Sequence, residues 1–365
     1  MKILTVVGAR PQFIKVAPVS KEFAKRKTID EIIVHTGQHF DYKMSDIFFD
    51  EMSLPLPKYN LKVNGGSHGS NTGKMLEKIE KVLFKEKPYA VLVYGDTNST
   101  FAGALAASKL NIPVLHVEAG VRSYNRKMPE EINRLLTDRI SEICFAPCEN
   151  AVNNLKKEGI ESSKIVMSDD VMADALRIYG QIANQESSII DKLNLKGKIF
   201  ILATIHRAEN TDKSEILKSI LLAFSKVSKE DNVEIVLPLH PRTKKAIASN
   251  NLNKFLESLI CIEPVSFLDM ICLEKNASLV VTDSGGVQKE AFFNDTKCIT
   301  LRTETEWVEL VKYGWNTLVN PSNSFEIYFE IIKNLKNNKF ISKPDIYGKG
   351  FAAKKIVDCI SKFSY

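Results

Sequence analysis

The feature that most constrains the fold is a repeated alternation of short apolar runs with longer amphipathic stretches. The apolar runs predict strands at Ile3–Val7, Glu31–His35, Ala90–Tyr94, Val114–His116, Ile143–Phe145, Ile165–Met167, Ile199–Thr204, Val233–Leu237, Leu279–Val281 and Cys298–Leu301. Helical periodicity is clearest over Phe13–Lys25, Gly73–Lys85, Ser99–Leu110, Glu130–Ser141 and Gly286–Phe293. Such an alternation is typical of βαβ units and parallel sheets.

The length of 365 residues suggests about two domains. A polar stretch, Arg177–Lys198, precedes a strand that has the character of a new first strand. We therefore expect an α/β chain with two doubly wound, Rossmann-like domains, 1–170 and 171–350, and a cleft between them. A C-terminal helix over 351–365 is expected to pack back on the first domain. Ligands of such domains bind beyond the carboxyl ends of the strands, so the residues that follow each strand are the candidates.

Composition excludes several classes of protein. The net charge is +6, but the lysines are spread along the chain, which favours solvated helix faces and a few anion sites over a nucleic-acid surface. The apolar runs are too short to cross a membrane, and the start lacks an export signal, so we expect a cytoplasmic protein. Six cysteines without a CxxC pair indicate buried thiols in a reducing compartment rather than disulfides or zinc.

In the first half, polar residues follow three predicted strands. Gly8-Ala9-Arg10-Pro11 leads into a helix, and Arg10 and Lys15 add positive charge that suits a diphosphate. The alternative is a capped helix with two surface cations. The segment has neither a GxGxxG nor a Walker pattern, so neither NAD nor ATP is indicated.

Three carboxylates can converge on the same edge of this first sheet. Asp96 and Glu118 follow strands, and Glu130 stands at a helix start. Neighbouring carboxylates raise one another's pKa, which is one way to obtain an acid and a base at neutral pH. The alternatives are an N-cap role for Asp96 and a favourable first-turn charge for Glu130.

In the second half, His206 and Arg242 follow predicted strands, and a further strand leads into Ser284-Gly285-Gly286. Backbone N–H groups of such a turn can approach a phosphate at a helix N-terminus. Glu290, one turn into the helix, could accept hydrogen bonds from ribose hydroxyls. A Gly-Gly turn that ends a helix is the alternative.

The motifs taken in order resemble the non-hydrolysing UDP-N-acetylglucosamine 2-epimerases. They are Gly8–Lys15, His35-Thr36-Gly37-Gln38-His39, Gly95-Asp96-Thr97, Val117-Glu118-Ala119-Gly120, Pro129–Arg134, His206–Asn210 and Asp283–Glu290. The resemblance implies a GT-B-type architecture that closes on a UDP-sugar. It also implies a homodimer without metal or redox cofactor, acting in polysaccharide biosynthesis for the cell envelope.

Carried over by position, the resemblance implies a role for each candidate residue. Asp96, Glu118, Glu130 and His206 would be catalytic. The UDP-sugar would be bound by Arg10, Lys15, His206, Ser284, Gly285, Gly286 and Glu290. The implied reaction eliminates UDP to give a 2-acetamidoglucal and then adds UDP back to give the 2-epimer.

Some residues depart from the common pattern of this family. Trp307 stands where most members have an arginine, while Arg242 and Arg302 remain available as cations. Of the residues around a regulatory UDP-GlcNAc, Gln38 and His39 match, whereas Phe40, Asp41 and Gly66 do not. A subgroup that acts on UDP-2,3-diacetamido-2,3-dideoxy-glucuronate is resembled more closely by three segments: Gly8–Phe13, His35–Phe40 and Thr305–Glu309. A GT-B glycosyltransferase is the alternative from another class.

Overall fold

The computed structural model describes residues 1–38, 46–337 and 342–364, which form two compact units. Unit 1 comprises residues 1–179 and 345–365, and unit 2 comprises residues 180–344. The division falls within helix α7 (Val171–Glu186), whereas the sequence analysis placed it after 170 and again after 350. The polar stretch before the second sheet is therefore largely helical.

Unit 1 is built on a seven-stranded parallel sheet in the order β3-β2-β1-β4-β5-β6-β7. The strands are β1 (Lys2–Val7), β2 (Asp30–His35), β3 (Tyr59–Asn60), β4 (Ala90–Tyr94), β5 (Val114–Val117), β6 (Ile143–Ala146) and β7 (Ile165–Met167). The helices are α1 (Arg10–Phe23), α2 (Asp46–Glu51), α3 (His68–Glu86), α4 (Asn98–Lys109), α5 (Pro129–Ile140), α6 (Glu149–Lys157), the 3₁₀ turn η2 (Ser162–Lys164), the start of α7, and α16 (Ala352–Lys362).

Unit 2 repeats the same strand pattern in a six-stranded parallel sheet, β10-β9-β8-β11-β12-β13. Its strands are β8 (Phe200–Thr204), β9 (Glu234–Pro238), β10 (Ile260–Ile262), β11 (Leu279–Thr282), β12 (Cys298–Thr300) and β13 (Asn316–Leu318). Its helices are α8 (Ile189–Lys192), α9 (Ala208–Thr211), α10 (Ser214–Asp231), α11 (Pro241–Ser249), the turn η3 (Asn253–Phe255), α12 (Phe267–Asn276), α13 (Gly285–Phe293), α14 (Val308–Lys312) and α15 (Ser324–Lys336).

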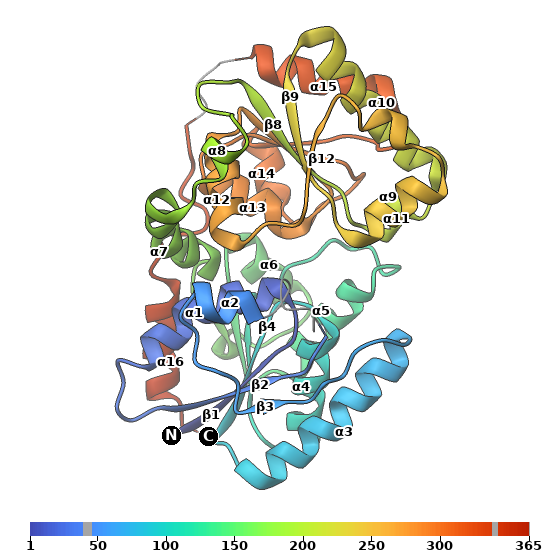
Figure 1. Ribbon diagram of the computed structural model, residues 1–365. Helices are drawn as coiled ribbons and strands as arrows, with labels where there is room; N and C mark the ends of the chain where they lie inside the picture. Colours follow the sequence, from blue (N-terminus) through green and yellow to red (C-terminus); the bar gives the residue numbers. More distant parts are fainter. Residues whose placement is uncertain (39–45, 338–341, 365) are drawn as a thin grey trace. The chain divides into compact units, whose positions relative to one another are not determined.

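Both faces of the unit 2 sheet are covered by helices, as alternate residues of β8 show. Ile201 and Ala203 pack against α10 and α15, whereas Phe200 and Leu202 pack against α8, α12 and α13 (Figure 1). In unit 1, Leu4 and Val6 of β1 belong to a core covered by α3 and α4. Parallel strands need such two-sided cover, which accounts for their continuous apolar runs. The predicted α/β, doubly wound class is thereby confirmed.

The C-terminal helix α16 belongs to unit 1, where it packs against α1. Asp174 of α7 accepts hydrogen bonds from the N–H groups of Ala352 (2.8 Å) and Ala353 (3.1 Å) at the first turn of α16. Arg26 and Asp358 form an ion pair between the segment after α1 and α16 itself. The end of the chain is therefore held to the first sheet by both charge and packing.

Candidate active site

In unit 1 the strand order reverses between β1 and β4, and ligands of doubly wound sheets bind at such a point. Arg10 and Lys15 lie on the helix that follows β1. Asp96 follows β4, and Glu118 follows β5. Because these three strands are parallel neighbours, their carboxyl ends meet at one edge. The structure therefore brings four predicted residues of the first half to the same end of one sheet, namely Arg10, Lys15, Asp96 and Glu118.

Lys15 and Glu118 form a buried ion pair at this edge. The Lys15 Nζ lies 2.6 Å from the Glu118 Oε1, and the side chains are 10% and 8% exposed. Gly95 lies against this pair, since a Cβ on it would stand 3.2 Å from the Lys15 Nζ. Glu118 has a φ of +71°, a backbone conformation that costs energy for a residue with a side chain. Such strain is concentrated at functional sites, and the sequence gives no indication of it.

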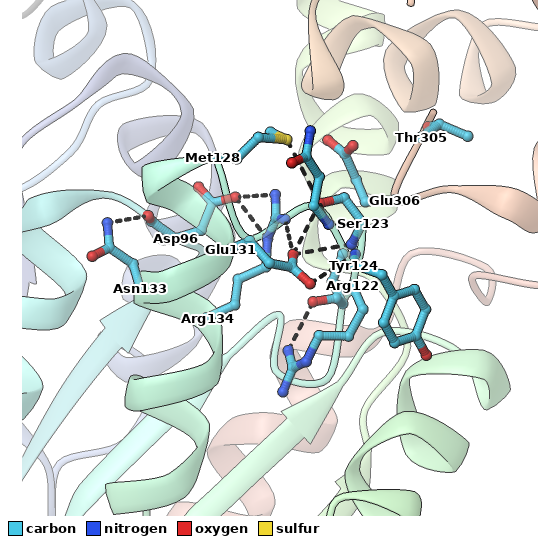
Figure 2. A network of polar contacts seen from close by, with 12 residues as sticks. Asp96, Arg122, Ser123, Tyr124, Met128, Glu131, Asn133, Arg134, Thr305 and Glu306 are labelled. Atoms are coloured by element: carbon cyan, nitrogen blue, oxygen red, sulfur yellow. Dashed lines mark hydrogen bonds and ion pairs between the residues drawn. The ribbon is translucent and has the colours of Figure 1, made fainter. Parts of the chain in front are cut away.

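Asp96 is held by an arginine that the sequence analysis did not single out. Its Oδ2 accepts from the Nε (3.0 Å) and Nη2 (2.6 Å) of Arg134, while Asn133 donates to its backbone carbonyl (Figure 2). Asp96 does not cap the following helix, because Thr97 accepts the hydrogen bond from Thr100 N–H there. The alternative considered for Asp96 is therefore wrong, and its carboxylate is oriented by α5.

The carboxylate beside the predicted Glu130 is the one that organises this part of unit 1. Glu131 is buried and accepts from the N–H of Ser123 (3.0 Å), the N–H of Tyr124 (2.8 Å) and the Nη1 of Arg134 (2.7 Å). Burial alone would raise the pKa of Glu131, but these donors outweigh it, and the net shift is downward. Glu130 is half-buried and lies outside this network, so its carboxylate remains a candidate for chemistry.

A second buried network lies behind the two carboxylate-bearing turns. His116 Nε2 contacts the carbonyl oxygen of Gly95 (2.8 Å), and its Nδ1 contacts Asp138 Oδ1 (2.6 Å). Asp138 also accepts from the N–H of Gly120 (3.0 Å) and from Arg122 (2.6 Å). Burial opposes ionisation of Asp138, but His116 and Arg122 lower its pKa. The turns that carry Asp96 and Glu118 are thus joined through one buried charge cluster.

The helix start after β1 does not offer all of its backbone N–H groups to an anion. The side chain of Gln12 accepts from the N–H groups of Gly8 (2.8 Å) and Ala9 (3.1 Å). Pro11 has no N–H group to donate. Any anion at this turn would therefore be bound mainly by the side chains of Arg10 and Lys15.

In unit 2 the corresponding reversal lies between β8 and β11, and it places His206 next to Asp283. The fully buried Asp283 carboxylate accepts from the backbone N–H groups of His206 (3.1 Å) and Arg207 (3.0 Å), and from Asn210 Nδ2 (3.1 Å). Its Oδ1 also lies 3.3 Å from the Nδ1 of the His206 ring. The ring of His206 is half-exposed and is oriented by a carboxylate that the sequence analysis included only in a motif.

Ser284 is the N-cap residue of α13, and Gly285 and Gly286 form its first turn. The glycines begin a helix rather than end one, so the alternative of a helix-ending turn is wrong. The N–H of Ser284 donates to Thr282 Oγ1 (2.9 Å), but the N–H groups of Gly285 and Gly286 have no acceptor within their own helix, which suits an anion. Glu290 is buried, and its Oε1 lies 3.4 Å from the position of a Cβ on Gly286. Gly286 and Glu290 therefore lie side by side.

The two remaining predicted cations both have protein partners. Arg242 lies beside Asp212, with its Nη2 2.6 Å from the Asp212 Oδ2, and both side chains are exposed. Arg302 is buried, and its Nη1 lies 3.0 Å from the Glu306 Oε2. A substrate carboxylate would have to compete with Asp212 or Glu306 for either arginine.

Other sequence-based expectations concern metals, thiols and the regulatory site. No group of three or more His, Cys, Asp or Glu within the described ranges is arranged to hold a metal ion. No helix there is long and apolar enough to cross a membrane. The six cysteines are unbridged, and Cys144, Cys148, Cys272 and Cys298 are buried. His39, Phe40 and Asp41 lie outside the described residues; Gln38 accepts a hydrogen bond from Ser99 (2.8 Å).

Comparison with known proteins gives one consistent result. The family model for UDP-N-acetylglucosamine 2-epimerases matches residues 21–361. A UDP-N-acetylglucosamine 2-epimerase homolog from Methanococcus maripaludis is 52% identical and is matched over 99% of both chains. The UDP-2,3-diacetamido-2,3-dideoxy-D-glucuronate 2-epimerase from Pseudomonas aeruginosa is 50% identical over 99% of this chain and 100% of its own. The crystal structure of Methanocaldococcus jannaschii UDP-GlcNAc 2-epimerase with UDP-GlcNAc and UDP has a TM-score of 0.94 at 44% identity, with both chains covered completely.

Proposed function

Since this chain belongs to the UDP-N-acetylglucosamine 2-epimerase family, we propose that it interconverts UDP-GlcNAc and UDP-ManNAc without net hydrolysis. One observation carries the proposal beyond family membership. Asp96, Glu118 and Lys15 gather at the carboxyl ends of three neighbouring strands of unit 1, with a buried ion pair of 2.6 Å among them. A reaction that moves a proton at carbon and releases a diphosphate needs both carboxylates and fixed positive charge.

The proposed chemistry begins with loss of UDP. The bond from C1 to the diphosphate oxygen breaks with its electron pair, and the C2 proton passes to an enzyme carboxylate. This leaves a 2-acetamidoglucal and bound UDP. A proton delivered to the opposite face of C2, with return of UDP to C1, gives the 2-epimer. The proposed acid and base groups are Asp96, Glu118, Glu130 and His206.

The UDP portion is assigned mainly to unit 2. The N–H of Ser284 already donates to Thr282 Oγ1 (2.9 Å), so Ser284 would bind a phosphate oxygen through its hydroxyl. Gly285 and Gly286 would bind phosphate oxygens through their backbone N–H groups, and Glu290 would accept hydrogen bonds from ribose hydroxyls. Arg10 and Lys15 would contribute side-chain charge in unit 1. Charge develops on UDP as it leaves, so fixed donors aimed at it lower the barrier.

Incubation with UDP-GlcNAc in D2O tests this proposal. Proton NMR should show deuterium entering C2 and the appearance of UDP-ManNAc, with only a trace of free sugar. Asp96→Asn should slow the exchange at least about 100-fold, the usual loss for an acid or base. Asp191→Asn, at an exposed carboxylate on α8, is the matched control and should exchange at the native rate. Transfer to an acceptor without C2 exchange would point to a GT-B glycosyltransferase instead.

A second candidate is the same reaction on UDP-2,3-diacetamido-2,3-dideoxy-glucuronate. The 50% identity to the Pseudomonas aeruginosa enzyme supports it. Arg242 and Arg302 are the proposed partners of the C6 carboxylate, which would replace Asp212 or Glu306 as their counter-ion. A charge-assisted pair of this kind would favour the uronate by about 1.5–3 kcal/mol, or about 10- to 100-fold. Competition between both sugars decides the matter, and an equal or higher kcat/KM for UDP-GlcNAc would eliminate the uronate.

We further propose that the chain acts in the cytoplasm as a homodimer, in polysaccharide biosynthesis for the cell envelope. Four buried thiols without disulfides suit a reducing compartment. Light scattering on the purified protein tests the dimer, and a monomeric mass at the assay concentration would contradict it.

A further inference from the structure

Trp307, which replaces the arginine of common family members, is directed into unit 2 rather than toward solvent. It is 3% exposed, and its indole Nε1 donates a hydrogen bond to the backbone carbonyl of Gly285 (2.9 Å). Gly285 is the first residue of α13, in the turn to which we assign the phosphates of UDP. Trp307 therefore supports this turn from within unit 2.

The hydrogen bond from Trp307 bears on the N–H group that a phosphate would use. In a trans peptide the carbonyl and the following N–H point in opposite directions within one rigid plane. Fixing the carbonyl of Gly285 therefore also fixes the direction of the Gly286 N–H. On another side of Gly285, Glu306 Oε1 lies 2.2 Å from where a Cβ would stand. The turn is thus held between two consecutive side chains.

Trp307 is itself fixed by several contacts. Lys289 Nζ of α13 lies 3.9 Å from the centroid of its ring, which is a cation–π contact. Its backbone N–H donates to Thr305 Oγ1 (3.1 Å), and that hydroxyl donates to Gln288 Oε1 (2.6 Å). Gln288 in turn donates to the carbonyl of Ser284 (3.1 Å). These contacts link Trp307 to the carbonyls of both Ser284 and Gly285 in the proposed phosphate turn.

We propose that Trp307 is a positioning residue for the diphosphate of the substrate, acting through the Gly285 carbonyl without touching the ligand. The proposal rests on the proposed function, because it assumes that the turn binds UDP. The neutral hydrogen bond from the indole holds the turn in one conformation before a ligand arrives. This lowers the entropic cost of ordering the turn on binding.

Trp307→Phe tests this role, because it keeps an aromatic ring near Lys289 and removes the N–H donor together with part of the indole ring, a loss of volume that Trp315→Phe shares. The other tryptophan supplies the control. Trp315 packs edge-on against Phe292 (5.3 Å between centroids) and lies outside the turn, so Trp315→Phe should bind as the native chain does. UDP and uridine are the two probes, measured by calorimetry on the full chain.

In Trp307→Phe, UDP should bind about 3- to 10-fold more weakly, the range for loss of one neutral hydrogen bond, while uridine binding stays unchanged. The KM for UDP-GlcNAc should rise with it. A lower Tm with the native ratio of UDP to uridine affinity would show a merely structural role and overturn the inference. Failure of the native chain to bind UDP would instead overturn the proposed function, and the positioning role with it.

Fluorescence gives an independent readout. In Trp315→Phe, Trp307 is the one remaining indole, since the chain has two tryptophans. Its emission should change when UDP is added and should not change with uridine. In Trp307→Phe, the signal of Trp315 should stay constant with both probes. A UDP response from Trp315 and none from Trp307 would contradict the assignment.

Discussion

Glu131 and Glu130 are neighbouring carboxylates of α5, and we expect a structural role for Glu131 and a functional role for Glu130. In Glu131→Gln, an amide replaces a carboxylate whose Oε2 accepts from Ser123 and Arg134 and whose Oε1 accepts from Tyr124. An amide has only one oxygen, so at least one donor loses its acceptor, and Arg134 loses a charged partner. Glu130→Gln changes a side chain that lies outside this network.

The expected magnitudes follow from burial and partners. Removing one member of a buried ion pair costs about 3–5 kcal/mol, and because Arg134 keeps Asp96, we expect about 2–4 kcal/mol for Glu131→Gln. Unit 1 has about 200 residues, so its Tm should fall by roughly 5–15 °C. Glu130→Gln should leave the Tm within about 1–2 °C of the native value and lower turnover at least about 100-fold.

Scanning calorimetry and the deuterium-exchange assay measure both effects on the same samples. The pKa of Glu131 lies below its ordinary value of 4.5, so its contribution to stability is complete above that pH and disappears as the pH falls through the lowered pKa. The difference in Tm between native chain and Glu131→Gln should therefore be constant near neutrality and shrink in acid. Equal Tm values for the two variants, or native turnover in Glu130→Gln, would refute the reasoning.

Three further predictions concern stability and ligand binding. Burial raises the pKa of Asp174 to about 6, so the folded state retains a proton that the unfolded chain releases. Relative to Asp174→Asn, the free energy of unfolding of the native chain should fall by about 3 kcal/mol as the pH rises from about 4 to about 6, and it should be constant above about pH 6. Denaturant titrations that show the same difference between the two proteins at every pH would contradict this. Gly120→Ala should lower the free energy of unfolding by about 2–4 kcal/mol, because φ is +80° and a Cβ would stand 2.4 Å from the backbone carbonyl oxygen of Ala151. Gly180→Ala is the control, since a Cβ there meets open space, and its midpoint of denaturant unfolding should equal or exceed the native one. Gly285→Val places a branched side chain at the first turn of α13, where it blocks the approach of a phosphate to the backbone N–H groups. The stabilisation by UDP, about 2.7 kcal/mol at 100 times its Kd, should therefore be lost, and a native Tm rise would contradict the assignment of the phosphates to this turn.

The central strands could be predicted from the sequence because each is a continuous apolar run. Ala90–Tyr94 and Ile165–Met167 have the predicted bounds, and most other predicted strands differ by one or two residues. Three strands were not predicted, namely Tyr59–Asn60, Ile260–Ile262 and Asn316–Leu318. Each has two or three residues and lies at the edge of its sheet, where one side needs no strand partner and the apolar signal is weak.

The sequence predicts the positions of several site residues but not the partners that hold them. Strand ends and motifs identify Asp96, Glu118 and His206, because position after a parallel strand fixes the edge at which a side chain lies. The partners of these residues depend on long-range packing. Arg134 on Asp96 and Asp283 beneath His206 come from segments 38 and 77 residues away in the chain, and no local pattern indicates either. For the same reason, no local pattern indicates that the Trp307 indole donates to the carbonyl of Gly285, 22 residues away.

The turn at the strand reversal is held by a different kind of side chain in each unit. At the strand reversal of unit 1, the neutral amide of Gln12 accepts from the turn after β1 and donates to the carbonyl of Tyr94 (3.0 Å) at the end of β4. At the reversal of unit 2, the carboxylate of Asp283 accepts from the turn after β8, including the N–H of His206. The link in unit 1 is neutral and leaves Lys15 paired with Glu118, whereas the link in unit 2 is a carboxylate that also lies 3.3 Å from the Nδ1 of the His206 ring. The proposed reaction uses both arrangements, because unit 1 would supply most of the acid and base groups and unit 2 would supply most of the contacts with UDP.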